Sequence, residues 1–269
     1  MEDRTVIVTI VDEKWASHGS VFDVFLASFR IGQGTKRLLD HLVVVTVSSQ
    51  AFQLCKSKHP HCFQLTTFVP KLAANMQLGV PDYHMLIRKR NNFLLEVLQL
   101  GYSFVFTEAD VMWLRSPISY IHPTNDITIP CELDSGDSQG RSNNPDSGFF
   151  YVKSTEFSIE LFKYWKLDGV LYPNSHAESL CDEIWISKEI IEIIGGKISF
   201  LNTENFGEFC QPSKDVSEVY TMHGNCCDSV ERKVHDLKLV LDDWINFKAP
   251  SSNTSSGMLP WRAPSKCNA

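Results

Sequence analysis

The sequence predicts an α/β fold, in which a mostly parallel β-sheet carries helices on both faces. Residues 5–11, TVIVTIV, form a continuous β-branched run that is typical of a strand buried on both faces. Along the rest of the chain, strand-like runs alternate with segments whose apolar residues have helical spacing. A third observation is the strand at residues 102–107, which ends directly in the carboxylates Glu108 and Asp110. Ligands of open α/β sheets bind at this end of the strands.

The amino-terminal half repeats one pattern, a short apolar strand followed by a helix. Residues 21–29 have helical spacing and should return the chain to a parallel strand at 41–48, with Gly32 and Gly34 in the turn between them. Four more elements are expected before the acidic pair, namely a helix at residues 51–58, a weak strand at 63–68, a long helix at 82–100 and a strand at 102–107.

The carboxyl-terminal half is less regular but keeps both kinds of element. We expect strands at residues 126–130, 148–153 and 197–201, and helices at residues 155–165, 178–194 and 234–247. Residues 132–145 are polar and glycine-rich, which predicts a loop that could fold over a ligand.

Length and composition indicate one large domain. With 269 residues, of which 43% are apolar, the chain can bury a full core. We expect a single domain at residues 1–248 and a Ser/Pro-rich tail at residues 249–269. The formal net charge of -7 offers no basic surface to nucleic acid or to an anionic membrane. No apolar run approaches the roughly 20 residues of a membrane span, so we expect no span, anchor or signal peptide in this sequence.

The eight cysteines are many for an enzyme of a reducing compartment. An even number permits disulfides in an oxidising compartment, but about a hundred connectivities are open. No CxxC pair occurs, and the adjacent Cys226 and Cys227 are poorly suited to a zinc site. The sequence Asn253-Thr254-Ser255 is a glycosylation sequon, which fits a secretory compartment.

The acidic pair Glu108 and Asp110 is the first candidate for chemistry. On an extended segment, side chains two residues apart leave on the same face, so both carboxylates could bind one hard metal ion. The residues on either side are bulky and apolar, and unpaired charge is costly in such surroundings. The alternative is a surface turn whose two acids are simply solvated.

A further metal ligand is expected from residues 220–233, YTMHGNCCDSVERK. His223 follows an apolar approach and precedes a glycine. A lone histidine is more often packed or hydrogen-bonded than a ligand. Next to an acidic metal site the case for ligation is stronger, because manganese accepts carboxylate and imidazole ligands together.

Four blocks of this sequence resemble the plant nucleotide-diphospho-sugar transferase family, which includes rhamnogalacturonan xylosyltransferases and extensin arabinosyltransferases. They span roughly residues 82–244. The blocks are GYSFVFTEADVMWLRSP, DSGFFYVKS, CDEIWI and FLNTENFGEFCQPSKDVSEVYTMHGNCCDSVERKVHDLKLVLDDW. The last block is the most distinctive of the four.

The resemblance implies a GT-A type fold, a Rossmann-like domain that binds a nucleotide sugar, with Mn2+ or Mg2+ as cofactor. Asp110 corresponds to the second acid of the family's Asp-x-Asp motif and would bind the metal and, through it, the diphosphate. Glu108 replaces the first aspartate and would contact the metal or the ribose. His223 matches the histidine of the family's His-Ala-Asn-Cys-Cys block and would be the late metal ligand, with Gly224 in place of the alanine.

The resemblance also implies contacts to the donor and a catalytic role for Asp182 beside Asp110. The residues expected to bind the donor are Thr9, Arg90, Glu108, Asp146, Gly148 and Lys233. Arg90 and Lys233 would contact the diphosphate, although solvated charges on helices are the ordinary alternative. Asp182 would position the sugar. Asp146-Ser147-Gly148 stands where relatives have Asn-Gly-Gly, and Asp182-Glu183 where they have Asp-Gln, so carboxylates replace hydrogen-bond-donating amides in two places.

The function implied is a metal-dependent, retaining glycosyltransferase. It would move a sugar from a nucleotide-diphosphate donor, UDP-pentose or UDP-galactose, to a cell-wall glycan or glycoprotein in the Golgi lumen. The departures leave open a non-catalytic or weakly active relative that binds a nucleotide sugar. A nucleotidyltransferase is disfavoured because no glycine-rich activating loop is found. A phosphatase fits poorly because Glu108 stands where its nucleophilic aspartate should be.

Overall fold

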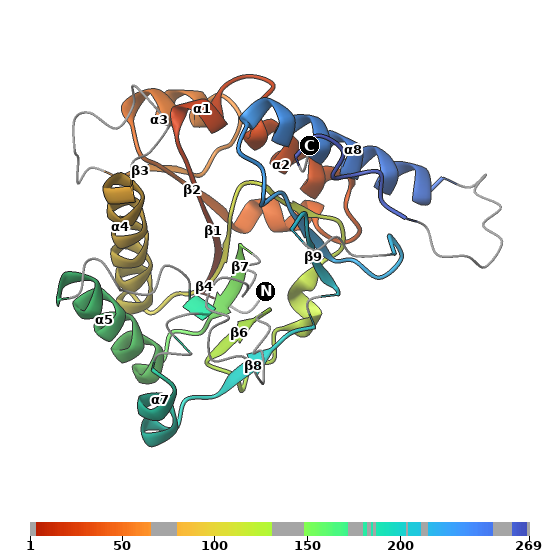
Figure 1. Ribbon diagram of the computed structural model, residues 1–269. Coiled ribbons are helices and arrows are strands. Elements are labelled where there is room, and N and C mark those ends of the chain that lie inside the picture. The colour runs from red at the N-terminus through yellow and green to blue at the C-terminus, as the bar shows by residue number, and fades with distance from the viewer. Residues whose placement is uncertain are drawn as a thin grey trace.

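The computed structural model of the chain describes residues 4–65, 80–130, 148–171, 180, 181, 184, 187–202, 204–210, 215–249 and 260–267. Their main sheet has seven strands in the order β3-β2-β1-β4-β7-β6-β8 (Figure 1). The strands are β1 (Thr5–Val11), β2 (Leu42–Thr46), β3 (Cys62–Gln64), β4 (Ser103–Thr107), β6 (Ile127–Ile129), β7 (Phe149–Val152) and β8 (Ile198–Phe200). Four of the pairings are parallel, and only those of β7 with β4 and β6 are antiparallel. The predicted α/β fold with a mostly parallel sheet is therefore confirmed.

Helices cover both faces of this sheet, as predicted. They are α1 (Glu13–Ala16), α2 (Val21–Ile31), α3 (Ser49–Lys56), α4 (Val80–Gln99), α5 (Glu156–Leu171), α7 (Lys188–Ile194) and α8 (Val230–Phe247). Figure 1 shows α4, α5 and α7 on one side of the sheet and α1, α2, α3 and α8 on the other. Each face of the sheet carries a hydrophobic core, and alternate residues of β1 point into one or the other. Ile7 packs with α2 and α8, whereas Val8 packs with α4 and α5. No helix of the described segments has the length and apolarity that a membrane crossing requires.

One predicted helix differs from the structure. The helix expected across residues 178–194 is interrupted, because Ser187 lies in a turn and acts as the N-cap of α7. Apolar periodicity alone gives no sign of a helix start at this position. The helix ends as predicted at Gly195, which takes the left-handed conformation with φ 75°. The polar loop expected at residues 132–145 lies outside the described residues.

A second, three-stranded sheet has the order β5-β10-β9. It consists of β5 (Val111–Trp113), β9 (Phe206–Glu208) and β10 (Thr221–His223). β10 runs antiparallel to β5 and parallel to β9. β5 begins directly after Asp110, so this small sheet joins the acidic turn to a segment that lies about a hundred residues further along the chain. None of its strands was predicted.

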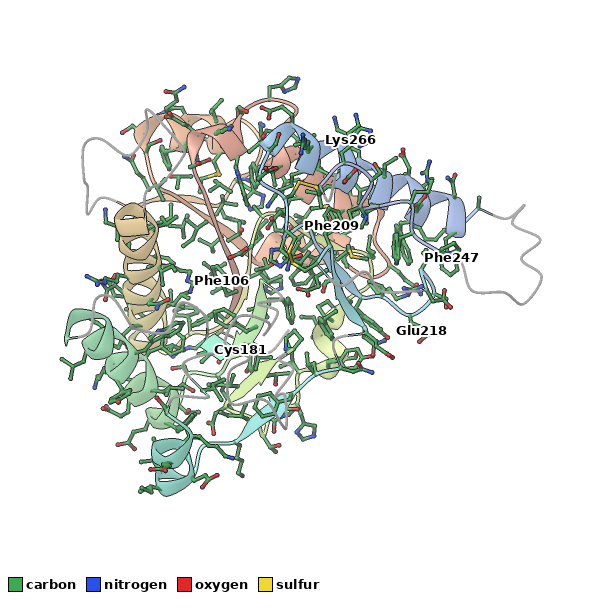
Figure 2. All side chains as sticks on the ribbon, viewed as in Figure 1. Phe106, Cys181, Phe209, Glu218, Phe247 and Lys266 are labelled. Carbon is green, nitrogen blue, oxygen red and sulfur yellow. A yellow bond between two sulfur atoms is a disulfide. The ribbon has the colours of Figure 1, made fainter. Side chains whose placement is uncertain are left out.

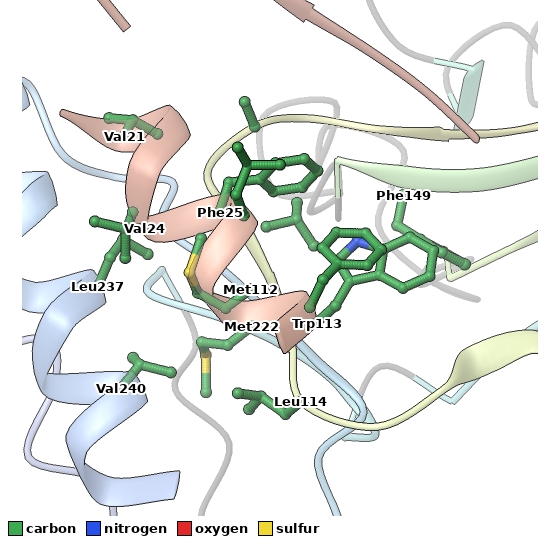
Figure 3. Close-up of a cluster of buried hydrophobic side chains, with 14 of the residues drawn as sticks. Val21, Val24, Phe25, Met112, Trp113, Leu114, Phe149, Met222, Leu237 and Val240 are labelled. Atoms are coloured by element: carbon green, nitrogen blue, oxygen red, sulfur yellow. The ribbon is translucent and has the colours of Figure 1, made fainter. Parts of the chain in front are cut away.

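The small sheet rests on the hydrophobic core between α2 and α8. Figure 3 shows Met112 of β5 and Met222 of β10 packed against Val24 of α2 and against Leu237 and Val240 of α8. All five side chains are at least 96% buried. The strands that lead to the candidate site are therefore held on a close-packed support.

Two of the described disulfides join segments beside the small sheet, and a third joins α3 to β3. The described pairs are Cys55–Cys62, Cys210–Cys226 and Cys227–Cys267, and Cys181 is disulfide-bonded as well. The adjacent Cys226 and Cys227 thus bind two different partners, one after β9 and one near the carboxyl terminus. This pairing agrees with the expectation that they do not form a zinc site.

Residues 260–267 pack along α8, where Figure 2 shows Lys266. The fully buried carboxylate of Asp236 accepts hydrogen bonds from the backbone N–H groups of Ser265, Lys266 and Cys267 and from the Ser265 hydroxyl. This part of the expected tail is thus joined to the rest by hydrogen bonds and by the disulfide of Cys267. The domain boundary at residue 248 stays a prediction.

Candidate metal centre

The acidic pair lies in a tight turn between β4 and β5, at the carboxyl edge of the parallel strands. The Glu108 N–H donates to the Gly148 carbonyl at 2.8 Å, and the Val111 N–H donates to the Glu108 carbonyl at 3.1 Å. The Asp110 carboxylate is buried, whereas a third of the Glu108 side chain is exposed. The turn therefore points one acid into the protein and leaves the other partly open to solvent.

The pairing of β5 with β10 brings His223 to this turn. Val111 is the register partner of His223, and the Gly224 N–H donates to the Asp110 carbonyl at 2.9 Å. The imidazole Nε2 of His223 lies 3.1 Å from Glu108 Oε2 and 3.3 Å from Asp110 Oδ1. The predicted set of three metal ligands is thus assembled in space, with ligand atoms within 4.8 Å of one another.

Lys233 of α8 also reaches the acidic turn. Its ammonium group donates to Asp110 Oδ2, and its Nζ lies 5.1 Å from the centroid of the Trp15 ring, over the ring face. Only 11% of its side chain is exposed. Lys233 is therefore a buried counter-charge of Asp110 in this structure, and the alternative of a solvated helix charge is wrong.

The charges shift the pKa values of two site residues in opposite directions. Burial raises the pKa of the Asp110 carboxyl, but the Lys233 ammonium and the His223 imidazole outweigh it and hold that pKa well below its usual range. Burial lowers the pKa of His223, but Asp110 and Glu108 outweigh it and raise that pKa well above its usual value. The charges of these side chains therefore favour an ionised aspartate beside an imidazolium.

The three ligand residues fit a hard divalent cation. Two carboxylates and an imidazole are a donor set that Mn2+ accepts. Asp110 Oδ1 is buried and accepts no hydrogen bond from any residue that the structure describes. Although His223 Nε2 lies 3.3 Å away, its geometry there is not that of a hydrogen bond. A buried acceptor without a donor is costly unless a ligand satisfies it.

Gly148 packs directly against the imidazole. Its φ is +59°, and a Cβ at this position would lie 3.0 Å from both His223 Cε1 and Val111 Cγ2. A side chain here would therefore press on His223 and would also strain the backbone. The structure places this predicted residue beside the triad, and its contact with a donor stays a prediction.

No described interaction joins the other residues predicted to bind the sugar donor to Glu108, Asp110 or His223. The Thr9 hydroxyl is buried within β1 and has no hydrogen-bond partner among the described residues. The Arg90 guanidinium lies over the rings of Phe106 and Trp165, at 5.3 and 5.9 Å from their centroids. The predicted roles of Thr9 and Arg90 stay predictions. Asp146 and Asp182 lie outside the described residues.

Sequence reasoning missed a polar pair beside His223. Glu208 is 5% exposed and is the register partner of His223 in β9, and its carboxylate accepts a hydrogen bond from Asn225 at 2.6 Å. No spacing in the sequence marks this pair, because it arises from the pairing of two three-residue strands. The only signal was Asn225 itself, which stands two residues after the predicted histidine ligand.

The fold and the site define an α/β protein with a carboxylate–histidine centre at the carboxyl edge of its sheet. Residues 37–237 match the sequence model of the nucleotide-diphospho-sugar transferase family. The chain belongs to this family, and the predicted resemblance and GT-A type fold class are confirmed. A nucleotide-sugar donor follows from the family.

The chain is similar to plant proteins along its whole length. It is 36% identical over 267 residues to the uncharacterized protein At4g15970 of Arabidopsis thaliana, covering 99% of this chain and 70% of that protein. It is also 22% identical over 112 residues to the beta-arabinofuranosyltransferase RAY1 of Arabidopsis thaliana, covering 39% of this chain and 21% of that protein.

Among solved structures, the chain is similar to the crystal structure of a glycosyltransferase involved in the glycosylation of the major capsid of PBCV-1. The two have 11% sequence identity and a TM-score of 0.49, and the match covers 87% of this chain and 98% of that one.

Proposed function

We propose that this family member is a metal-dependent glycosyltransferase that uses Mn2+ or Mg2+. The single observation that carries the proposal is the assembly of Glu108, Asp110 and His223, whose ligand atoms lie within 4.8 Å of one another. Two of these side chains are buried, Asp110 in the turn before β5 and His223 at the end of β10, so little side-chain entropy would be lost on binding a cation.

In this proposal, Asp110 and His223 hold the cation and Glu108 completes the set or contacts the ribose. A bound cation would offset the negative charge that develops on the departing nucleoside diphosphate. The ammonium group of Lys233 already donates a hydrogen bond to Asp110, and it would help to bind the diphosphate. Arg90 and Thr9 would make further donor contacts.

The donor we favour is a UDP-pentose, with UDP-galactose as the alternative. The name of RAY1, an arabinofuranosyltransferase, supports a pentose. The acceptor would be a cell-wall glycan or glycoprotein. Transfer would be retaining, with the acceptor hydroxyl attacking from the leaving-group face and no dedicated base. Asp146 and Gly148 would then face the donor sugar, and Asp182 would position it.

We place this activity in the Golgi lumen. The described disulfides, among them Cys210–Cys226 and Cys227–Cys267, support an oxidising compartment, because such bonds are rarely kept in a reducing one.

A second candidate is a relative that binds a nucleotide sugar without transferring it. The observation in its favour is the ammonium of Lys233, which already neutralises Asp110 and would compete with a metal for that carboxylate. The exchanges of amide for acid at Asp146 and Glu183 would also alter the contacts with the sugar.

The test is a transfer assay with a panel of UDP-pentoses and UDP-hexoses, with Mn2+ or with EDTA, combined with thermal unfolding. The transferase predicts release of UDP from one donor with Mn2+ only, and a metal-dependent rise in melting temperature with the same donor. A melting shift without UDP release would favour the non-catalytic relative. If folded protein shows neither UDP release nor a melting shift, both candidates are contradicted.

A further inference from the structure

Asn225 and Glu208 form a hydrogen-bonded pair beside the metal triad. The Nδ2 group of Asn225 donates to Oε2 of Glu208 at 2.6 Å, and the glutamate is buried. A carboxylate in such surroundings depends on its hydrogen-bond donors. The pair therefore links β9 to the segment after β10, close to the disulfide between Cys210 and Cys226.

Glu208 lies on the same face of the small sheet as the metal-ligating histidine. Val111, His223 and Glu208 are register partners across β5, β10 and β9, and paired residues on neighbouring strands point to the same face. This is the face toward Gly148, because a Cβ there would touch both Val111 and His223. The pair is thus next to the imidazole and is not behind it.

The other end of the Asn225 amide fixes the end of β9. Its Oδ1 accepts from the backbone N–H groups of Phe209 and Cys210, at 3.0 and 3.2 Å. The Phe209 N–H also donates to the His223 carbonyl at 3.0 Å. One side chain therefore joins the backbone that follows His223 to the strand beside it through three hydrogen bonds.

We infer that Asn225, with Glu208 as its partner, is a positioning residue that holds His223 against Asp110 and so preforms the metal centre. The inference rests on the proposed metal dependence. Without the amide, the end of β9 beside His223 loses three hydrogen bonds and keeps the Cys210–Cys226 disulfide and the bond from the Phe209 N–H to the His223 carbonyl. The imidazole would then have to be ordered by the metal itself, and the metal affinity would fall.

The experiment measures the Mn2+ dissociation constant, by electron paramagnetic resonance of free Mn2+, together with thermal unfolding of each variant. Asn225→Asp keeps the acceptor for Phe209 and Cys210 but puts a carboxylate oxygen against Glu208. The double variant with Glu208→Gln restores the bond with donor and acceptor exchanged. The matched control is Asn205→Ala, because the Asn205 amide also bonds backbone, the Glu218 carbonyl at 2.8 Å, but at the opposite end of the small sheet.

We expect Asn225→Asp and Asn225→Ala to raise the dissociation constant about 10- to 100-fold, as for other residues that orient metal ligands. The double variant should return to within about threefold of the wild type, because the two changes are coupled through one bond. The control should bind Mn2+ as the wild type does. If Asn225→Ala does not fold, the comparison of Asn225→Asp with the double variant tests the inference.

A wild type that binds Mn2+ and folded Asn225 variants with the same affinity would overturn this inference and leave the proposed function intact. A double variant no better than Asn225→Asp would also overturn it. A wild type that binds no Mn2+ would overturn the proposed metal dependence, and this inference with it.

Discussion

Two buried aspartates, Asp110 beside α8 and Asp236 within it, show how a candidate site differs from a structural anchor. Asp110 and Asp236 are 1% and 0% exposed, both contact α8 or belong to it, and both have a pKa below the usual range. Asp236 accepts four hydrogen bonds from residues 265–267. Asp110 accepts one from Lys233, while its other oxygen accepts none within the described part of the chain.

The two aspartates do not differ in burial or in charge. They differ in how many of their acceptor positions receive a hydrogen bond. An ionised carboxylate has two oxygens and about four acceptor positions, and the chain fills them at Asp236. At Asp110 the unfilled oxygen faces two further ligand groups, Glu108 and His223. A buried carboxylate satisfied by its own chain stabilises the fold, whereas an unsatisfied one beside other ligands is arranged for a bound ion.

The largest effect should follow from Asp110→Asn. The amide keeps the size of the side chain but removes the charge that binds a cation and leaves Lys233 without its counter-charge. We expect kcat/KM for sugar transfer to fall by at least about 100- to 1,000-fold. Steady-state UDP release measures this, with Asp236→Asn as the matched change. A comparable loss in folded Asp236→Asn would remove the distinction drawn here.

Asp236→Ala should act on stability. Burial raises the pKa of Asp236, but hydrogen bonds from His235 and from the backbone at residues 265–267 outweigh it and depress that pKa. We expect the free energy of unfolding at neutral pH to fall by about 3 kcal/mol, measured by urea denaturation with the disulfides intact.

The pH dependence of this contribution follows from the sign of the shift. A depressed pKa stabilises the fold above the unfolded value of about 3.9, and the contribution is lost as the pH falls toward the folded pKa. The difference between wild type and Asp236→Ala should therefore shrink below about pH 4. A difference that does not change with pH would show that the charge of Asp236 is not its cause.

His223→Ala should weaken Mn2+ binding about 10- to 100-fold. Because Asp110 and Glu108 raise the pKa of His223 against its burial, a metal must displace a proton from the imidazole. In the wild type, the Mn2+ affinity should rise as the pH rises, by about tenfold per pH unit while the imidazolium prevails. Isothermal titration in several buffers measures this slope, and a slope that survives in His223→Ala would assign it to another group.

The smallest effects come from two glycines that flank the imidazole. In Gly148→Ala, the Cβ would lie 3.0 Å from His223 Cε1 at a φ of +59°, so we expect a loss of about 1–2 kcal/mol in stability and weaker Mn2+ binding. In Gly224→Ala, the Cβ would lie 2.9 Å from Leu237 Cδ2, the movable end of a flexible side chain. That change should cost under about 1 kcal/mol and leave Mn2+ binding unchanged. Chemical denaturation and Mn2+ titration of both variants test the contrast, and equal effects would contradict it.

Much of the fold could be predicted because its main elements carry long patterns. The run at β1, the strand ending in Glu108 and the helical spacing of α2 are each sufficient by themselves. The acidic pair could be recognised because charge breaks an apolar run, and His223 because of the block around it.

The rest depends on contacts between distant and short segments. Three-residue strands such as β9 and β10 are too short for periodicity, so the pair of Glu208 and Asn225 could not be foreseen. In sequence, Asp236 is one of several helix charges, and only the return of residues 265–267 distinguishes it from a solvated one. Lys233 resembled a solvated charge because its partner, Asp110, stands 123 residues earlier in the sequence.

The most direct test of the central claim is Mn2+ titration of the wild type, Asp110→Asn and Asp236→Asn, followed by electron paramagnetic resonance with and without UDP. We expect the wild type and folded Asp236→Asn to bind one Mn2+, more tightly with UDP present, and Asp110→Asn to lose this binding. Equal Mn2+ binding by Asp110→Asn and the wild type would contradict it, because the unsatisfied oxygen of Asp110 would then have no part in holding the ion.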